Sequence, residues 1–581
     1  MTSTPTETPT EQPLRHPGAF SPVTLIFTVL LSVLGALIGL HLITTLGISA
    51  NTSVIGALIA MMVGRIGILG LRRFRDTNRQ NLAQTAISAA TFAAANALLM
   101  PIGIAWAFGR TDLVWPLLIG VTIGLGIDAW VLYKAFGSRF LPATAPWPPG
   151  VAAAETIKAG DEGGKRAGIL VGSGLVGAVM SWFSLSGAAA GVAFIGNVVA
   201  LFMLGIGLFV RQYSTSFPGL EDVSLSAEYI PHGIMVGAGV VALGQALAIF
   251  VNRKGRKAAK AEAEALAIAA ASPANAVDDA QGASAGTPTG TTGTTTATTD
   301  IDPALEFSRS PGQMAFGLTG GFVMFMAGAI ILGLVSGTAA DLSLPALIGW
   351  VLFAALAAFV HEIIVGLAAM HSGWFPAFAV TLIFLVVGLV VGLPEVPLMV
   401  LVGYCAATGP AFADMGYDFK TGWLLRRVHS RHPGYLAYEM SGRRQQYYSS
   451  VIGFAVALAM VAVLWQPFFE EGRIPPVSVV FADTIAAGLT NPDAVTNLLI
   501  WAVPGAIVQL LGGSSRQMGV MLATGLLLSQ PNACWLIFGA LIIRLAVRRF
   551  KGKQAEENLS LVGAGLIAGD AIASLGSVFR R

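Results

Sequence analysis

Residues 375–393 read FPAFAVTLIFLVVGLVVGL and carry no charged side chain. An α-helix needs about 20 consecutive apolar residues to cross a bilayer core of about 30 Å. Similar runs, each with at most one charged side chain, recur at residues 55–71, 114–132 and 175–209. A lone strand cannot satisfy its backbone hydrogen bonds in lipid, so the repeated runs predict an all-α, polytopic membrane protein.

The composition of the whole chain agrees with this prediction. Of 581 residues, 55% are hydrophobic and 11% are charged, and the mean hydropathy is +0.72. Soluble globular domains carry about 25% charged residues, so this chain could not cover a soluble surface. A net charge of +3, with no Lys/Arg-rich block beside aromatic residues, argues against nucleic-acid binding. The two cysteines, Cys405 and Cys534, lie in apolar runs and are expected to be buried thiols.

The apolar runs predict about 14–16 transmembrane helices in two membrane halves, residues 22–251 and 312–581. Residues 252–311 begin with basic residues and continue as GTPTGTTGTTTATTD, which has too little apolar content to form a core. We therefore expect a flexible cytoplasmic linker there. Residues 1–21 are rich in Pro and Thr and are expected to form a disordered tail.

Clusters of basic residues predict the orientation of the chain. Cytoplasmic loops carry an excess of Lys and Arg. Four segments fit this pattern: residues 72–79, the start of the linker, residues 426–444 and residues 548–553. They predict a multi-pass protein of the cell (inner) membrane with a cytoplasmic N-terminus. Seven apparent spans before the linker conflict with that topology, which suggests that either one span is missed or one segment is re-entrant.

Residues 142–165 are the candidate for that re-entrant segment. They read PATAPWPPGVAAAETIKAGDEGGK, and the prolines prevent a regular helix before about Val151. Glu155 and Lys158 would then lie at i, i+3 on a short helix and could form an ion pair. Broken helices at membrane depth often line a transporter cavity. The alternative is an ordinary cytoplasmic loop that carries a surface ion pair.

Several charged side chains lie inside or beside apolar runs. Asp414, Asp418 and Lys420 occur in AFADMGYDFKTG, where the two acids are at i, i+4. His361 and Glu362 are adjacent within the apolar residues 350–370. Ionisable groups at membrane depth are costly and suggest proton or solute sites. The alternatives are an interfacial loop for the first group and a structural buried pair for the second.

Two further polar features accompany these acids. Gln84, Thr85 and Ser88 form a polar stripe on the third predicted span, which could line a solute path or hold helices together. Asp570 is a lone acid in the glycine-rich run GAGLIAGDAI.

Gly164 and Lys165 are followed by Arg166 and not by Ser or Thr, so they do not form a P-loop, and no nucleotide motif indicates ATP as an energy source.

Six ordered segments resemble the oligopeptide transporter (OPT) family, which includes the yellow stripe-like metal-chelate transporters. They are NLAQTAISAA (residues 81–90), PWPPGVAAAETIKAG (146–160), EYIPHGIMVGAG (228–239), YDFKTGWLL (417–425), GRRQQYY (442–448) and GAGLIAGDAI (563–572). The resemblance extends from about Phe20 to Ser577, outside the linker. MHSG at residues 370–373 departs from the family's Asn-Pro-x-Ser-Gly pattern, which leaves the cargo open.

The resemblance implies a secondary active transporter built from two repeated halves, with no enzymatic activity, cofactor or bound metal. It would import short peptides or metal-chelate complexes, usually with protons, and could form a homo-oligomer. A membrane-embedded enzyme or a sensor without transport activity is the alternative. The implied cargo-binding residues are Gln84, Thr85, Glu155, Lys158, His371, Lys420 and Gln446. The implied proton-coupling residues are Glu155, His361, Glu362, Asp414, Asp418 and Asp570.

The linker yields a first testable prediction. Deleting residues 284–299 should leave expression and uptake close to those of the full chain, because the Gly/Thr tract lacks apolar side chains with which to dock. Membrane yield, size-exclusion profile and uptake into proteoliposomes would be compared for the two proteins. Loss of the folded protein after the deletion would contradict the linker prediction.

Overall fold

The structure is a computed structural model of the 581-residue chain. It describes residues 14–47, 56–57, 59–60, 71–159, 165–216, 224–251, 308–372, 377–490, 492–513, 516–528, 530 and 532–578. The predicted linker lies outside these residues, apart from residues 308–311. No β-strand occurs in the described part of the chain, which confirms the all-α prediction.

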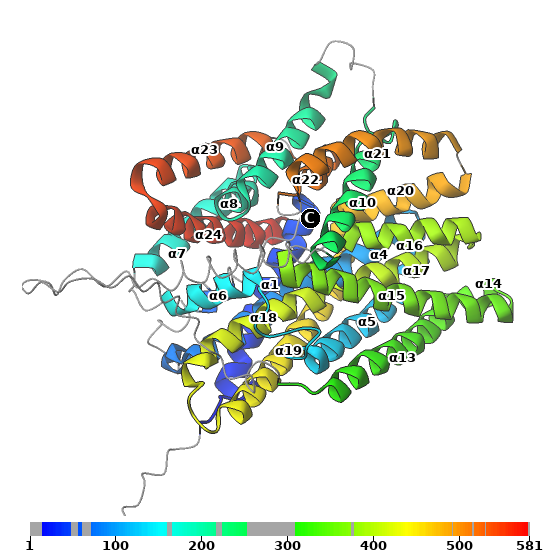
Figure 1. Ribbon diagram of the computed structural model, residues 1–581. Coiled ribbons are helices and arrows are strands. Elements are labelled where there is room, and N and C mark those ends of the chain that lie inside the picture. The colour runs from blue at the N-terminus through cyan, green and yellow to red at the C-terminus, as the bar shows by residue number, and fades with distance from the viewer. Residues whose placement is uncertain are drawn as a thin grey trace, which may run out of the picture.

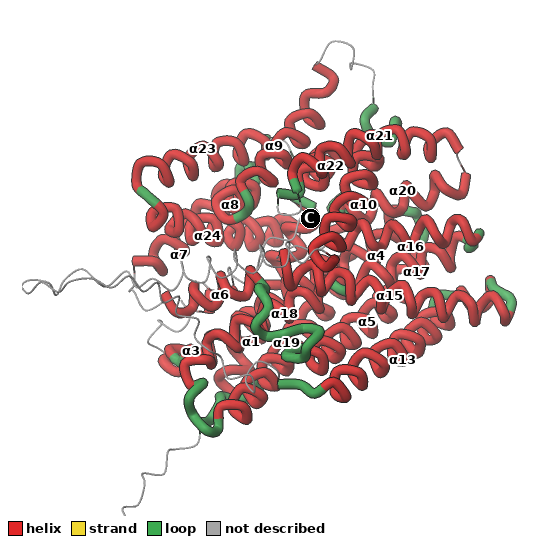
Figure 2. The backbone as a smooth tube through the Cα atoms, viewed as in Figure 1, coloured by secondary structure: helices red, strands yellow, loops and turns green. Residues whose placement is uncertain are grey.

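The helices before the linker are α1 (Pro22–Thr45), η1 (Leu71–Arg75), α3 (Thr77–Phe92), η2 (Ala93–Leu99), α4 (Met100–Ala107), η3 (Thr111–Leu113), α5 (Val114–Ala135), α6 (Pro148–Ala159), α7 (Lys165–Trp182), α8 (Gly187–Ile195), α9 (Val198–Tyr213), η4 (Ser214–Ser216) and α10 (Ile230–Val251). The helices after it are α13 (Pro311–Val335), α14 (Thr338–Asp341), α15 (Leu344–Ser372), α16 (Ala377–Val391), α17 (Glu395–Ala407), α18 (Pro410–Arg426), η5 (Arg427–His429), α19 (Tyr435–Glu470), α20 (Pro476–Thr490), α21 (Pro492–Gly512), α22 (Met518–Leu527), α23 (Ala533–Lys551) and α24 (Lys553–Val578). Figure 2 shows these helices joined by loops.

The helices have the length and surface of a polytopic membrane protein. Among the described residues, 9 helical stretches are long and apolar enough to cross a membrane, and shorter apolar helices accompany them. Large apolar side chains such as Val390, Leu344 and Phe316 are exposed on the outside of the bundle. Exposing apolar side chains to water is unfavourable, whereas exposing them to lipid is not, so this surface fits a membrane environment. The predicted number of 14–16 crossings depends on the shorter helices and stays a prediction.

Two long helical stretches run through the interior of the bundle. In the stretch from α3 to α4 and in the stretch from α17 to η5, 94% of the apolar window is buried. Figure 1 shows α23 and α24 with α7–α9 on one side of the molecule, and α13 with α5 and α15 on the opposite side. Helices α3, α18 and α19 pack against one another between these groups. The central stretches are therefore surrounded by protein and largely shielded from lipid.

Both central stretches contain a break in regular α-helix. Helix α3 continues through the π-helix η2, and π-helical turns often mark functional sites. Helix α17 ends at Thr408, and Gly409 then adopts φ 86°, a left-handed conformation that glycine tolerates best. Pro410 occupies the first turn of α18, where no intrahelical N–H donor is needed. The backbone N–H of Gly409 at this break is bound by a side chain from another helix, Asp128 on α5.

Residues 142–150 enter the protein interior. Trp147 is fully buried with φ 41°, and its backbone N–H donates to the carbonyl of Met370 at 2.9 Å. Helix α6 begins at Pro148, slightly before the predicted start near Val151. Gly150 packs so closely on α18 that an added Cβ would lie 2.3 Å from the carbonyl oxygen of Tyr417. Residues 160–164 of the predicted re-entrant segment lie outside the described residues.

The described part of the predicted N-terminal tail contacts α19. The backbone N–H of Ala19 donates to Gln445 Oε1 at 2.8 Å, and Ala19 is buried. His16 packs on the ring of Tyr438 with 5.8 Å between centroids. Burial lowers the pKa of His16 to about 4, so this side chain is neutral at physiological pH. Residues 14–21 are therefore part of the packed structure.

Close helix packing yields a second prediction. A Cβ on Gly237 of α10 would lie 1.7 Å from the carbonyl oxygen of Ala502 on α21, so the two backbones would have to separate. Gly237→Ala should destabilise the protein by about 1–3 kcal/mol, the usual cost of overpacking. Gly539→Ala on α23 is the matched control, because its Cβ meets no atom within 4 Å. Thermal unfolding in detergent should show a lower midpoint for Gly237→Ala alone, and equal midpoints would contradict the prediction.

Candidate functional site

Six buried polar side chains from three helices meet in the interior, and we refer to them as the polar core. They are Gln84, Thr85 and Ser88 on α3, Asp414 and Asp418 on α18, and Gln446 on α19; each is 0% exposed. The spacings of three and four residues, Thr85 to Ser88, Gln84 to Ser88 and Asp414 to Asp418, place these side chains on one face of each helix. The periodicity of α3 and α18 therefore directs both polar faces towards the same place.

Hydrogen bonds connect the three helices within the polar core. Gln84 Nε2 donates to Asp418 Oδ1, and Ser88 Oγ donates to Asp414 Oδ1 at 2.7 Å. Gln446 Nε2 donates to the backbone carbonyl of Asp418 at 2.7 Å and to Thr85 Oγ1 at 3.2 Å. Each carboxyl group thus receives a donor from α3. Such a set of acceptors and amide groups can bind an ammonium group or a proton and can recognise peptide amides.

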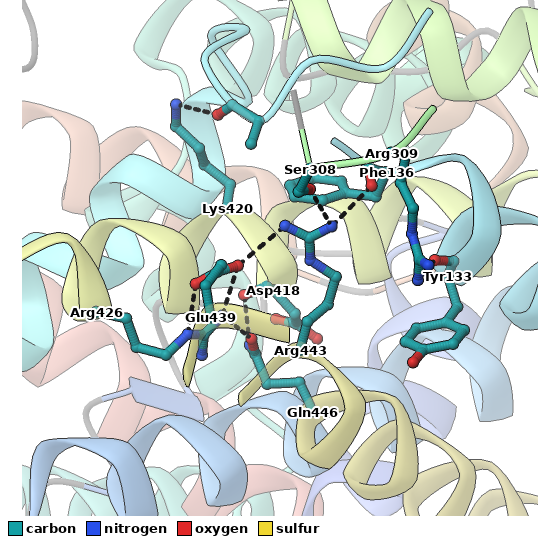
Figure 3. Close-up of polar contacts among 11 residues, drawn as sticks. Tyr133, Phe136, Ser308, Arg309, Asp418, Lys420, Arg426, Glu439, Arg443 and Gln446 are labelled. Atoms are coloured by element: carbon teal, nitrogen blue, oxygen red, sulfur yellow. Dashed lines mark hydrogen bonds and ion pairs between the residues drawn. The ribbon is translucent and has the colours of Figure 1, made fainter. Parts of the chain in front are cut away.

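A buried ion triad adjoins the polar core (Figure 3). Glu439 Oε2 accepts from Arg426 Nε at 2.7 Å, and Glu439 Oε1 accepts from Arg443 Nη2 at 3.0 Å. The side chains of all three residues are at most 2% exposed. Arg426 Nη2 also donates to Gln446 Oε1 at 3.0 Å, which links the triad to the core and fixes the orientation of the Gln446 amide.

The triad also holds the ends of two other segments. Arg443 Nη1 donates to the carbonyl of Phe136 at 2.8 Å and to Ser308 Oγ at 2.9 Å. Phe136 follows α5, and Ser308 is where the described chain resumes after the linker. Figure 3 shows Arg443 between these contacts and Glu439. The residues that precede α6 and α13 are thus fixed to α18 and α19 by one guanidinium group.

The positions of Arg426 and Arg443 correct a prediction from the sequence. Both were expected in a basic cytoplasmic loop, but they lie within α18 and α19 and are buried. The pattern of basic residues cannot reveal this, because burial depends on Glu439 as a partner in space. Glu439 itself was not predicted as a site residue, although an acid four residues before Arg443 is a recognisable helical pairing signal.

The whole chain matches one known protein family. The profile described as OPT oligopeptide transporter protein matches residues 20–220 and 222–580. The chain belongs to this family. Membership in the OPT family makes it a membrane transport protein. No curated protein sequence shows a significant match to the chain.

Lys420 is held outside the polar core of this OPT protein. Its Nζ donates to the carbonyls of Ala143 and Ala145, each at 2.9 Å, and lies 4.6 Å from the ring centroid of Trp423. Thr421 Oγ1 likewise donates to the carbonyl of Gly150 at 2.9 Å. The side chain of Lys420 therefore fastens residues 142–150 to α18 in this conformation.

Three other residues implied by the resemblance belong to the 142–159 segment or lie next in sequence to a residue that binds it. Glu155 and Lys158 form the expected ion pair at 2.9 Å, with side chains 25% and 41% exposed. His371 is near the end of α15, directly after Met370, whose carbonyl binds Trp147.

The remaining predicted acids occupy two other places in the OPT fold. Asp570 on α24 accepts from the N–H of Ala188 at the start of α8 at 2.7 Å and lies 3.2 Å from His41 Nε2. His361 Nε2 lies 2.9 Å from the carbonyl of Ala377, and Glu362, the next residue in the sequence, is fully buried.

Among the described residues, no group of three or more His, Cys, Asp or Glu side chains could hold a metal ion.

Asp128 on α5 is a further buried acid that sequence reasoning missed. It is fully buried, and its Oδ2 accepts from the N–H of Gly409 at 2.7 Å. The signal was available, because Asp128 is the one charged residue in the apolar run 114–132. What the sequence could not show is that this carboxyl lies at the break between α17 and α18.

The ion triad yields a third prediction. Glu439→Gln would leave Arg426 and Arg443 buried without their carboxylate, which should destabilise the protein by about 3–5 kcal/mol. Glu395→Gln is the control, because Glu395 forms an exposed ion pair with Arg110 at 3.0 Å and its loss should cost at most about 1 kcal/mol. Thermal unfolding in detergent would compare both variants with the unchanged protein. Similar midpoints for the two variants would show that the triad does not hold α18 to α19.

Proposed function

We propose that this OPT protein is a proton-coupled importer of short peptides and that the polar core binds the cargo. The observation that supports this most strongly is the pair of carboxyl groups, Asp414 and Asp418, facing amide and hydroxyl groups in a fully buried site. A peptide carries an ammonium group that carboxylates bind, and backbone amides that Gln84 and Gln446 can pair with. In this conformation these groups bind one another, so cargo entry requires α3 and α18 to separate.

The charge of the polar core favours peptides over metal-chelate complexes as cargo. A chelator that holds a metal presents carboxylates, and these would meet the like charges of Asp414 and Asp418. Arg426 is paired with Glu439 and also donates to Gln446 Oε1, and Lys420 donates to the carbonyls of residues 143 and 145. A small solute with an ammonium group at one end fits the acidic face better than an anionic complex does.

Coupling to protons is part of this proposal. The sequence contains no nucleotide motif, so an ion gradient is the remaining common energy source for concentrative uptake. Buried carboxyl groups in membrane helices are typical components of proton relays. We further propose the cytoplasmic membrane with an internal N-terminus, supported by basic clusters such as Arg73, Arg75 and Arg79, and by Arg548 and Arg549.

Uptake into proteoliposomes tests the proposed function and yields a fourth prediction. Labelled di- and tripeptides should accumulate when the outside is more acidic, and a protonophore should abolish the accumulation. Asp418→Asn keeps the size of the side chain and its acceptor for Gln84 but removes the charge. Loss of a charged hydrogen bond costs about 1.5–3 kcal/mol, so peptide affinity should fall roughly ten- to hundredfold.

Controls separate this proposal from its alternatives. Glu395→Gln, which changes an exposed acid, should transport like the unchanged protein. Accumulation of a metal chelate in place of peptides would refute the proposed cargo, and accumulation that survives the protonophore would refute proton coupling. Absence of any uptake by a folded protein would favour the enzyme or sensor alternative.

A further inference from the structure

The break between α17 and α18 is covered by two acidic side chains from other helices. On one side, Asp128 Oδ2 of α5 accepts from the N–H of Gly409 at 2.7 Å. The N–H of Phe412, in the first turn of α18, also interacts with this carboxyl group. Asp128 therefore occupies the N-terminal end of α18, where free N–H groups favour a negative charge.

Glu362 on α15 covers the same break from the other side. Val365 and Gly366 follow it by three and four residues and contact the break: a Cβ on Gly409 would lie 2.8 Å from Val365 Cβ, and a Cβ on Gly366 would lie 2.3 Å from the ring of Phe412. Since these positions share one helix face, Glu362 is directed to the same region. Asp128 is close enough to exert an electrostatic effect on the Glu362 carboxyl.

These two carboxyl groups have fewer partners than their burial requires. Glu362 is 0% exposed, and neither of its carboxyl oxygens has a hydrogen-bond partner among the described residues. Asp128 is equally buried, and its Oδ1 also lacks one within the same part of the chain. An ionised carboxylate without a partner is very costly in such a place, and two at the same break cost more. One proton on the pair removes this repulsion and supplies an O–H donor.

No cation among the described residues replaces that proton. The other titratable groups packed around the break are His361 on α15 and Tyr404 and Cys405 on α17. His361 Nδ1 lies 3.3 Å from Thr408 Oγ1, and Tyr404 Oη donates to the carbonyl of Phe325 at 3.2 Å. Cys405 Sγ contacts the carbonyl of Ala357 at 3.7 Å. Each of these side chains is thus engaged with neutral groups, and none neutralises the two acids.

We propose that Asp128 and Glu362 form a two-carboxylate proton site that carries the coupling proton, separate from the polar core that binds cargo. This inference rests on the proposed function and names the site of coupling. With one proton on the pair, Asp128 binds the start of α18 as observed, and Glu362 stays neutral. Release of the proton leaves two like charges across the break, which drives α5 and α15 apart and frees the N-terminus of α18.

Helix α18 connects this proton site to the cargo site. Asp414 and Asp418 follow Gly409 by five and nine residues, which corresponds to about 8 and 14 Å along a helix that rises 1.5 Å per residue. A displacement of the start of α18 therefore moves both carboxyl groups of the polar core relative to Gln84 and Ser88 on α3. Proton release and cargo release are then linked through one rigid helix, and the linkage acts in both directions.

Neutral variants of the pair provide the test and the fifth prediction. Glu362→Gln and Asp128→Asn keep the size of each side chain and mimic a permanently protonated site. In proteoliposomes, both variants should lose peptide accumulation driven by a pH gradient. Both should retain exchange of labelled for unlabelled peptide in the absence of a gradient, because the polar core is unchanged. Asp418→Asn should weaken both activities through its lower peptide affinity, and Glu395→Gln should change neither.

A direct measurement of the proton makes the inference independent of transport. Infrared difference spectra of the purified protein between acidic and alkaline pH should contain a carboxylic C=O band that is absent from Glu362→Gln. Accumulation by both variants with unchanged sensitivity to a protonophore, or an unchanged infrared band, would overturn the inference. Failure of the unchanged protein to accumulate peptide, with the band present, would instead overturn the proposed function and leave the proton site standing.

Discussion

The Glu439 carboxylate holds two guanidinium groups in the protein interior, and the arrangement of α18 depends on this contact. Glu439 and Arg443 are both on α19, and Arg426 is the last residue of α18. The ion pair between Glu439 and Arg426 therefore fixes the two helices to each other, and Arg443 shares the same carboxylate. Taking three charges out of solvent is unfavourable unless each is paired and hydrogen bonded, which restricts the helices to one register. Through Phe136 and Ser308, the same network fixes the segments that follow α5 and precede α13.

With its far end fixed in this way, α18 carries two polar sites with different surroundings. Near its middle, Asp414 and Asp418 receive neutral donors from Ser88 and Gln84 on α3. At its start, Gly409 presents backbone N–H to Asp128, next to the buried Glu362. The first environment supplies hydrogen-bond donors that a cargo can replace. The second environment contains two acidic side chains, and a proton bound to either one removes the repulsion between them. One helix therefore joins the proposed cargo site to the proposed proton site.

Sequence reasoning reached much of this site because helical periodicity is local. The i, i+4 spacing of Asp414 and Asp418 placed both on one face, and the stripe at Gln84 and Ser88 identified the polar face of α3. It failed where the partner comes from a distant segment. Lys420 was expected to meet cargo, but it binds carbonyls of residues 143 and 145, which lie more than 250 positions earlier in the chain.

The sequence by itself determined the solvent and the fold class of this protein. Uncharged runs as long as residues 375–393 can satisfy their backbone in lipid only as helices, and this follows from composition alone. Only the tertiary structure decided which charged residues are buried and with which partners. Arg443 belongs by its sequence to a basic loop, and Asp128 is a lone acid in an apolar run. Arg443 donates to the carbonyl of Phe136 and Asp128 accepts from the N–H of Gly409, and such contacts exist only after helices from both halves have packed.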